Sequence, residues 1–174
     1  EEWQKLGIEA GFAEKQMKVI EAFSRMGVTI TCTCTPYLIG NLPRFGEHIA
    51  WSESSAVCFA NSVIGAITNR EGGPSSIASA LTGKTPEYGM HLEKNRQAQV
   101  RVLVKAKIDS VPKFGALGRV LGEKIGNKIP LIEGIQNASL EELKSLSAAI
   151  ATYGGTAMFH MKGITPAKTI VPKK

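Results

Sequence analysis

Residues 28–34, Val28-Thr29-Ile30-Thr31-Cys32-Thr33-Cys34, follow an amphipathic segment and indicate the fold class. The apolar residues and cysteines alternate with threonines, which predicts a strand with one apolar face. Upstream, the apolar residues of 12–26 recur at helical spacing, and Gly27 stands where a helix C-terminal cap belongs. A strand that directly follows a helix favours an α/β fold.

Further helices and strands are predicted along the rest of the chain. Ser52 is placed to cap a helix that runs to about Ile64, with Gly65 at its end. Alternation over 100–108 predicts a strand with one buried face, at a sheet edge or in an antiparallel pair. We also expect helices over 76–82, 116–125 and 140–152, the last with a Ser139–Glu142 capping box, and a final strand over 156–161.

Composition and charge limit the kinds of function that the chain can have. The chain has 174 residues, of which 43% are hydrophobic, and no apolar run approaches the roughly 20 residues that span a bilayer. The net charge is +6, but the basic residues are scattered and 6% of residues are aromatic, which argues against nucleic-acid binding. Attraction of small anionic substrates remains open. We expect a single domain over 1–174, and the start without Met reads as an internal piece of a longer protein.

Three cysteines, Cys32, Cys34 and Cys58, argue against a disulfide framework and for a reducing, cytoplasmic compartment. On a strand, the C-x-C pair would place both thiols on one face, as a buried pair or as one metal ligand with a neighbour. Three cysteines can hold an iron–sulfur cluster with one open iron, although this spacing matches no local cluster motif.

The helix after Ser52 carries a stripe of polar residues. Ser54 and Asn61 are seven apart, as are Ser55 and Ser62, so each pair lies near one face. Interhelical hydrogen bonds and a ligand site explain this stripe equally well, because buried polar groups need partners. Glu53 in the first turn suits the helix dipole, and a role as general acid or base would require a raised pKa.

Glycines before the helix at 76–82 form a candidate anion site. Gly72 and Gly73 would allow a ligand to approach the backbone closely. Free N–H groups and the helix dipole favour an anion there, and Arg70 is placed to bind a carboxylate or phosphate. A capped turn with an exposed arginine is the alternative. The histidines His48, His91 and His160 show no zinc spacing.

Several consecutive motifs resemble the aconitase X family over nearly the whole chain. They are Thr33-Cys34-Thr35-Pro36-Tyr37, Gly46 to Val57 (GEHIAWSESSAV), Phe59 to Ala66 (FANSVIGA), Thr68 to Ser75 (TNREGGPS), Tyr88 to Leu92 and Gly163 to Pro166. The resemblance implies an aconitase-like layered α/β/α fold with a mixed sheet. It also implies a hydro-lyase built from a large and a small subunit.

The form of the Ser52-Glu53-Ser54-Ser55 segment resembles the archaeal, two-subunit branch of that family. The resemblance therefore implies removal of water from (R)-5-phosphomevalonate, giving trans-anhydromevalonate 5-phosphate in the archaeal mevalonate pathway. Dehydration of cis-3-hydroxy-L-proline is the near alternative. A non-catalytic anion-binding module, with the Gly72–Gly73 turn as its site, is the alternative from another class.

The resemblance also implies roles for particular residues. It assigns one ligand of an iron–sulfur cluster, expected to be 4Fe-4S, to Cys34, with Cys32 as a neighbour and Cys58 as a packing thiol. Its implied substrate contacts, to a small anionic hydroxy acid, are Asn61, Ser62, Ser54 and Arg70. The base is expected on the small subunit, with Glu53 as the candidate in this chain. The other cluster ligands are expected outside these residues.

Overall fold

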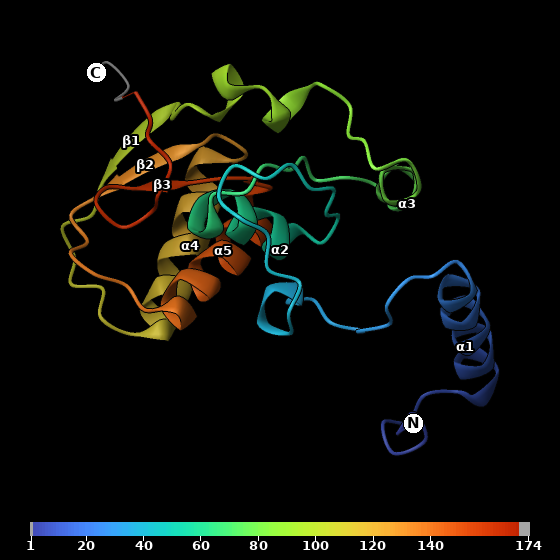
Figure 1. Cartoon of the computed structure of the whole chain (residues 1–174). Helices are drawn as coiled ribbons and strands as arrows, with labels where there is room; N and C mark the ends of the chain where they lie inside the picture. The colour runs from blue at the N-terminus through green and yellow to red at the C-terminus, as the bar shows by residue number, and fades with distance from the viewer. Residues whose placement is uncertain (1, 171–174) are drawn as a thin grey trace. The chain divides into compact units, whose positions relative to one another are not determined.

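A computed structural model describes residues 2–170, which divide into one unit up to Thr33 and a second from Cys34 onward (Figure 1). Among the described residues, no helix is both long and apolar enough to cross a membrane.

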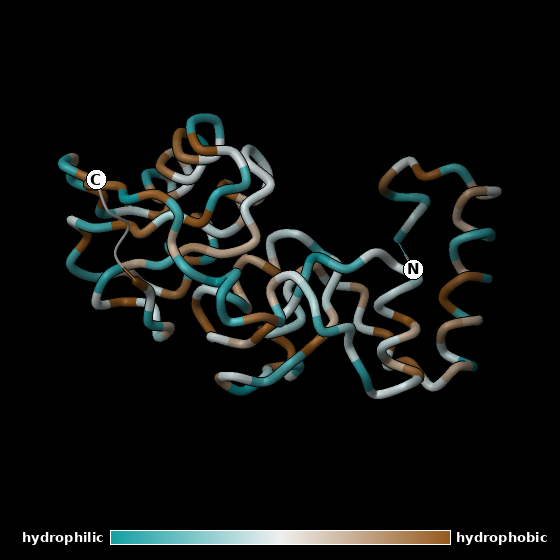
Figure 2. The backbone as a smooth tube through the Cα atoms, turned by 90° about the horizontal axis from the view of Figure 1, so that it is seen from above, coloured by the Kyte–Doolittle hydropathy of each residue, from teal (hydrophilic) through white to brown (hydrophobic). Residues whose placement is uncertain are grey.

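The first unit contains α1, Ala10–Arg25, which confirms the predicted helix. Its turns carry both hydrophobic and hydrophilic residues (Figure 2), and within this helix no residue is buried. The predicted strand over 28–34 is wrong, because these residues form no ladder and Val28 is 44% exposed. A strand needs a hydrogen-bonding neighbour, and the positive φ of Cys32 (47°) interrupts the pleat that alternation suggested.

The second unit is built around three parallel strands in the order β1-β2-β3. They are β1, Val100–Leu103; β2, Pro130–Glu133; and β3, His160–Met161. Helix α4, Val111–Ile125, joins the first two strands, and α5, Leu140–Gly154, joins the last two. This βαβαβ arrangement confirms the α/β class, although the described sheet is parallel where a mixed sheet was expected.

The strands differ from prediction in length and number. β1 ends at Leu103 and β3 begins at His160, so both are shorter than their alternating segments. β2 was not predicted, because its four residues are all buried and give no alternation. The edge position predicted for β1 is confirmed, whereas its partner is parallel rather than antiparallel.

Helices α4 and α5 pack side by side on one side of the sheet (Figure 1). They approach closely at Gly118, where an added Cβ would lie 2.7 Å from the Ala149 Cβ and 2.9 Å from the Leu146 carbonyl oxygen. The helices and the sheet enclose a core that includes Phe114, Ile132, Leu146, Ile150 and Phe159.

A helical segment packed against α5 carries most of the candidate site residues. It begins as α2, Ser54–Phe59, continues as a single π-helical turn, η2, Ala60–Ile64, and ends at Gly65 in the left-handed conformation. The N-cap is Glu53, where Ser52 was expected. The remaining short elements are η1, Pro36–Leu38; α3, Gly73–Thr82; η3, Gly89–His91; and η4, Glu93–Arg96.

Candidate functional site

The Glu53 carboxylate caps the N-terminus of α2. Its Oε2 accepts hydrogen bonds from the Ala56 N–H at 2.7 Å and from the Ser55 hydroxyl at 2.6 Å. Burial alone would raise the pKa of Glu53, but these bonds and one from Ser54 outweigh it and lower the pKa. The side chain is therefore held as a carboxylate that binds the helix N-terminus.

Aromatic stacking fixes the turn that follows Cys34. Tyr37 is buried and stacks on Phe59, with ring centroids 4.1 Å apart and planes 10° apart. Burial, followed by the charges of Glu53 and Glu141, raises the pKa of Tyr37 to about 12, so the phenol stays protonated. The Cys34 thiol, just before this anchored turn, is exposed.

Cys58 lies inside the core, as expected of a packing thiol. Burial raises its pKa to about 12, although the neighbouring hydroxyls of Ser62 and Ser147 act in the opposite direction. A thiol held protonated in this way is a poor nucleophile and a poor metal ligand.

Asn61 is fully buried on η2 and joins three segments through its side-chain amide. Its Nδ2 donates to the carbonyl oxygens of Thr68 (2.9 Å) and Ala157 (3.0 Å). Its Oδ1 accepts from the Thr68 N–H at 3.0 Å and from Arg96 Nη1 at 2.9 Å. Ser62, also fully buried, accepts the Phe159 N–H at 2.9 Å. Both predicted substrate contacts therefore have partners within the chain.

The segment before α3 combines an exposed cation with a buried anion. Arg70 is exposed, whereas Glu71 is 5% exposed and its Oε2 accepts from the Ser75 hydroxyl at 2.6 Å. Among the described residues, the buried Glu71 Oε1 and Ser76 Oγ have no hydrogen-bond partner. Buried polar atoms without a partner are rare in folded proteins, which distinguishes this segment from its surroundings.

A pair of histidines, which was not predicted from the sequence, lies beside this segment. His48 Nδ1 and His91 Nδ1 are 2.7 Å apart, and their rings stack at 15° with centroids 5.0 Å apart. Such a contact requires one proton between the two nitrogens. Burial is the largest cause that lowers the pKa of His91, and its buried Nε2 has no partner among the described residues. No sequence signal links residues so far apart in the chain.

Hydrogen bonds connect these segments into one wall. Thr68 Oγ1 accepts the Trp51 N–H at 3.1 Å, which ties the loop before α2 to the segment after η2. Asn69 Oδ1 accepts the Met90 N–H at 2.7 Å, which adds η3. The wall thus brings together the predicted residues Asn61 and Ser62 with Glu71 and His91, which were not predicted.

The described residues do not by themselves form an iron–sulfur site. No group of three or more His, Cys, Asp or Glu side chains among them is placed to hold a metal ion. Cys58 is buried with a raised pKa, so within the second unit Cys34 is the thiol suited to ligation.

Two family models match the chain in succession. The aconitase X first domain matches residues 1–94, and the aconitase X second domain matches residues 98–174. The phosphomevalonate dehydratase large subunit of Methanocaldococcus jannaschii is 53% identical over 94% of this chain and 42% of that protein. The cis-3-hydroxy-L-proline dehydratase of Hypocrea jecorina is 40% identical over 94% of this chain and 28% of that protein.

A crystal structure of Thermococcus kodakaraensis aconitase X in its holo-form has the same fold. It matches with a TM-score of 0.90 and 50% identity, covering 95% of this chain and 43% of that one. The chain therefore spans about two fifths of the length of the large subunits that it resembles.

Proposed function

Because the chain belongs to the aconitase X family, we propose that it forms part of the large subunit of a phosphomevalonate dehydratase. This enzyme would remove water from (R)-5-phosphomevalonate and give trans-anhydromevalonate 5-phosphate. The observation that carries the proposal is 53% identity to a phosphomevalonate dehydratase large subunit over 94% of this chain. A small subunit would complete the enzyme and supply the catalytic base.

The wall around α2 and α3 supports a site for a small anionic hydroxy acid. Of the four substrate contacts that the resemblance implies, Arg70 and Ser54 would contact the substrate directly. Asn61 and Ser62, whose side chains have internal partners, would support the site through their hydrogen bonds. Arg70 is exposed beside Gly72 and Gly73, and the α3 N-terminus adds free backbone N–H groups that favour an anion. Glu53 is held as a helix-capping carboxylate, which favours a base supplied by the partner.

Cys34 is proposed as one thiolate ligand of an iron–sulfur cluster, of the 4Fe-4S type, whose other ligands lie outside these residues. An iron without a protein thiolate would supply a Lewis acid for the leaving hydroxyl. The exposed Cys34 thiol and the tightly stacked turn after it support this assignment.

The activity is tested with the full-length protein and its small subunit, reconstituted anaerobically with iron and sulfide. We expect turnover of (R)-5-phosphomevalonate with a kcat/KM at least about 100-fold above that for cis-3-hydroxy-L-proline, about 3 kcal/mol of discrimination. The 40% identity to a hydroxyproline dehydratase makes that amino acid the natural competitor. The opposite preference would assign the second activity, and a colourless, inactive complex would refute both.

The cluster ligand is tested separately by thiol alkylation and peptide mass spectrometry. Cys34 should react in the apo-protein and be protected after reconstitution, and Cys34→Ala should prevent cluster formation. Cys58 is the matched control, because its burial should protect it in both states and Cys58→Ala should leave the cluster in place. Equal behaviour of the two variants would contradict the assignment of Cys34.

A further inference from the structure

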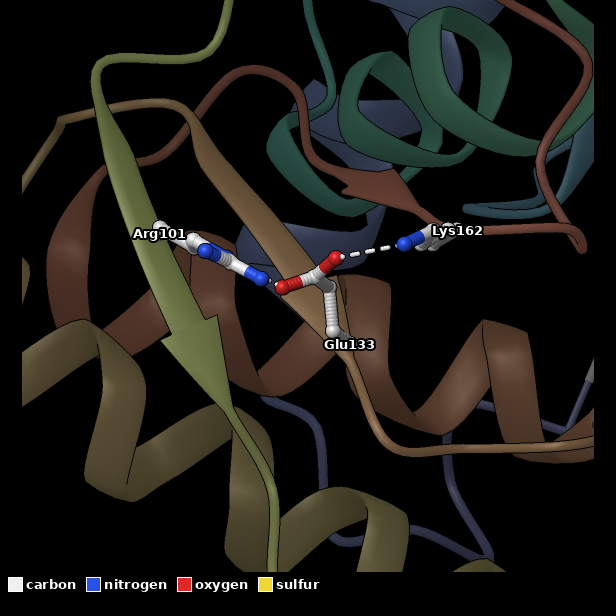
Figure 3. Close-up of polar contacts among 3 residues, drawn as sticks. All are labelled: Arg101, Glu133 and Lys162. Atoms are coloured by element: carbon white, nitrogen blue, oxygen red, sulfur yellow. Dashed lines mark hydrogen bonds and ion pairs between the residues drawn. The ribbon is translucent and has the colours of Figure 1, made fainter. Parts of the chain in front are cut away.

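A second polar cluster lies where β2 and β3 end, beside Arg101 on the neighbouring strand β1 (Figure 3). Glu133, the last residue of β2, points one oxygen at Arg101 of β1 and the other at Lys162, which directly follows β3. Its Oε2 accepts from Arg101 Nε, and its Oε1 accepts from Lys162 Nζ at 2.9 Å. One carboxylate thus holds two cations from neighbouring strands.

The carboxylate is enclosed, but its two cations reach solvent. The side chain of Glu133 is 7% exposed, whereas those of Arg101 and Lys162 are 43% and 69% exposed. Hydrogen bonds from Arg101 and then Lys162 lower the pKa of Glu133, so it stays ionised. Arg101 binds it through Nε, which leaves the terminal NH₂ groups of the guanidinium for another acceptor.

A cavity of about 450 Å³ adjoins the cluster and is lined by all three of its residues. Gln136 adds an amide to the lining, and the turns at Gly134 and Gly163 bring backbone close to it. Gly134 has φ 96°, and an added Cβ would lie 2.2 Å from the Val104 carbonyl oxygen, so this turn requires glycine. In parallel α/β sheets, ligands bind outside the carboxyl ends of the strands.

We propose that this cavity binds a phosphoryl dianion, gripped by the terminal NH₂ groups of Arg101 and by the Lys162 ammonium. Glu133 fixes both cations in place before the anion arrives, which reduces the ordering cost of binding. Two cations and one carboxylate leave a net positive charge for the ligand, and arginine suits phosphate geometry. The site does not depend on the dehydratase proposal.

A purely structural tie between the strands is the competing explanation. Because the two cations are 43% and 69% exposed, solvent screening and lost side-chain entropy limit what their pairs with Glu133 add to stability. The exposed ends of both cations beside a cavity are better explained by a ligand than by stability alone.

The test is titration calorimetry of the full-length protein with inorganic phosphate at low ionic strength. We expect Arg101→Gln and Lys162→Gln each to weaken phosphate binding about tenfold, the scale of one lost hydrogen bond between charged groups. Arg119→Gln is the matched control, because Arg119 is an exposed arginine paired with Glu123 on α4 and lies outside the cavity. It should leave the affinity unchanged.

Two further measurements distinguish a loss of phosphate binding from misfolding and identify the source of the anion. Arg101→Lys keeps a charge for Glu133 but loses the guanidinium fork, so it should weaken phosphate binding while the thermal midpoint stays constant. A raised KM for a phosphorylated substrate in this variant would assign the site to that substrate, and an unchanged KM would assign it to free phosphate. Equal losses in the Arg101 and Arg119 variants, or no phosphate binding by the parent protein, would overturn the proposal.

Discussion

At the residue scale, Asn61 is a buried side chain whose hydrogen bonds link separate segments of the candidate site. Replacement by Ala would remove the acceptor for the Thr68 N–H and for the Arg96 guanidinium, both of which lie in the core. A buried donor without a partner costs about 1–3 kcal/mol. We therefore expect Asn61→Ala to lower the free energy of unfolding by about 3 kcal/mol, as measured by urea denaturation.

Asn95 provides the control for this measurement, because it is exposed and donates to the Gly89 carbonyl oxygen. Asn95→Ala should change the unfolding free energy by less than about 0.5 kcal/mol. If Asn61 served the substrate alone, its variant would raise KM and leave unfolding unchanged, which is the result that would contradict the structural role.

At the element scale, the crossing of α4 and α5 depends on glycine. A Cβ at Gly118 would lie 2.7 Å from the Ala149 Cβ and 3.0 Å from the Ile150 nitrogen, both on a packed helix. We expect Gly118→Ala to destabilise the protein by about 1–3 kcal/mol, because the helices must separate. Thermal unfolding of the full-length protein would measure the loss.

Gly115, on the same helix, gives a matched comparison. An added Cβ there meets the Ser145 hydroxyl at 3.0 Å, which is the end of a side chain that can rotate. Gly115→Ala should be neutral or stabilising by up to about 1 kcal/mol, because alanine favours the helix. Similar losses in both variants would mean that the close approach at Gly118 does not determine the crossing.

The elements that the sequence predicted well carry their own local signals. Ser139 and Glu142 exchange both hydrogen bonds of the expected capping box, and Gly65 adopts the expected left-handed cap. The errors arose where neighbours decide the structure. Residues 28–34 alternate but form no strand in the described part of the chain, and β2 is a strand because β1 and β3 flank it.

The candidate site, like the fold, could be predicted only in part from the sequence. The polar stripe containing Asn61 and Ser62 was visible in the sequence, but its partners were not, so both explanations of it stayed open. The structure supplies internal partners for both side chains. The His48–His91 contact and the buried Glu71 arise from long-range folding, which periodicity within one segment cannot reveal.

At the scale of the whole molecule, two buried histidines link stability to pH. Burial is the main cause that lowers the pKa of His160, whose Nε2–H donates to the Arg96 carbonyl oxygen at 2.7 Å. Burial is also the largest cause that lowers the pKa of His91. The charges of His48 and Arg96 lower this pKa further, and the charge of Glu71 opposes them. In the unfolded chain both histidines would titrate near about pH 6.5.

Protonation therefore favours the unfolded chain. Above about pH 6.5 the stabilisation is fully present, and it is lost as the pH falls toward the lowered folded-state values. We expect the thermal midpoint of the full-length protein to be level between about pH 8 and 7 and to fall by several degrees toward about pH 5.5. His160→Gln keeps an amide N–H for the Arg96 carbonyl but cannot titrate, so it should flatten this decline, and His91→Gln should add to the effect. An unchanged decline in the double variant would assign the pH dependence to other groups.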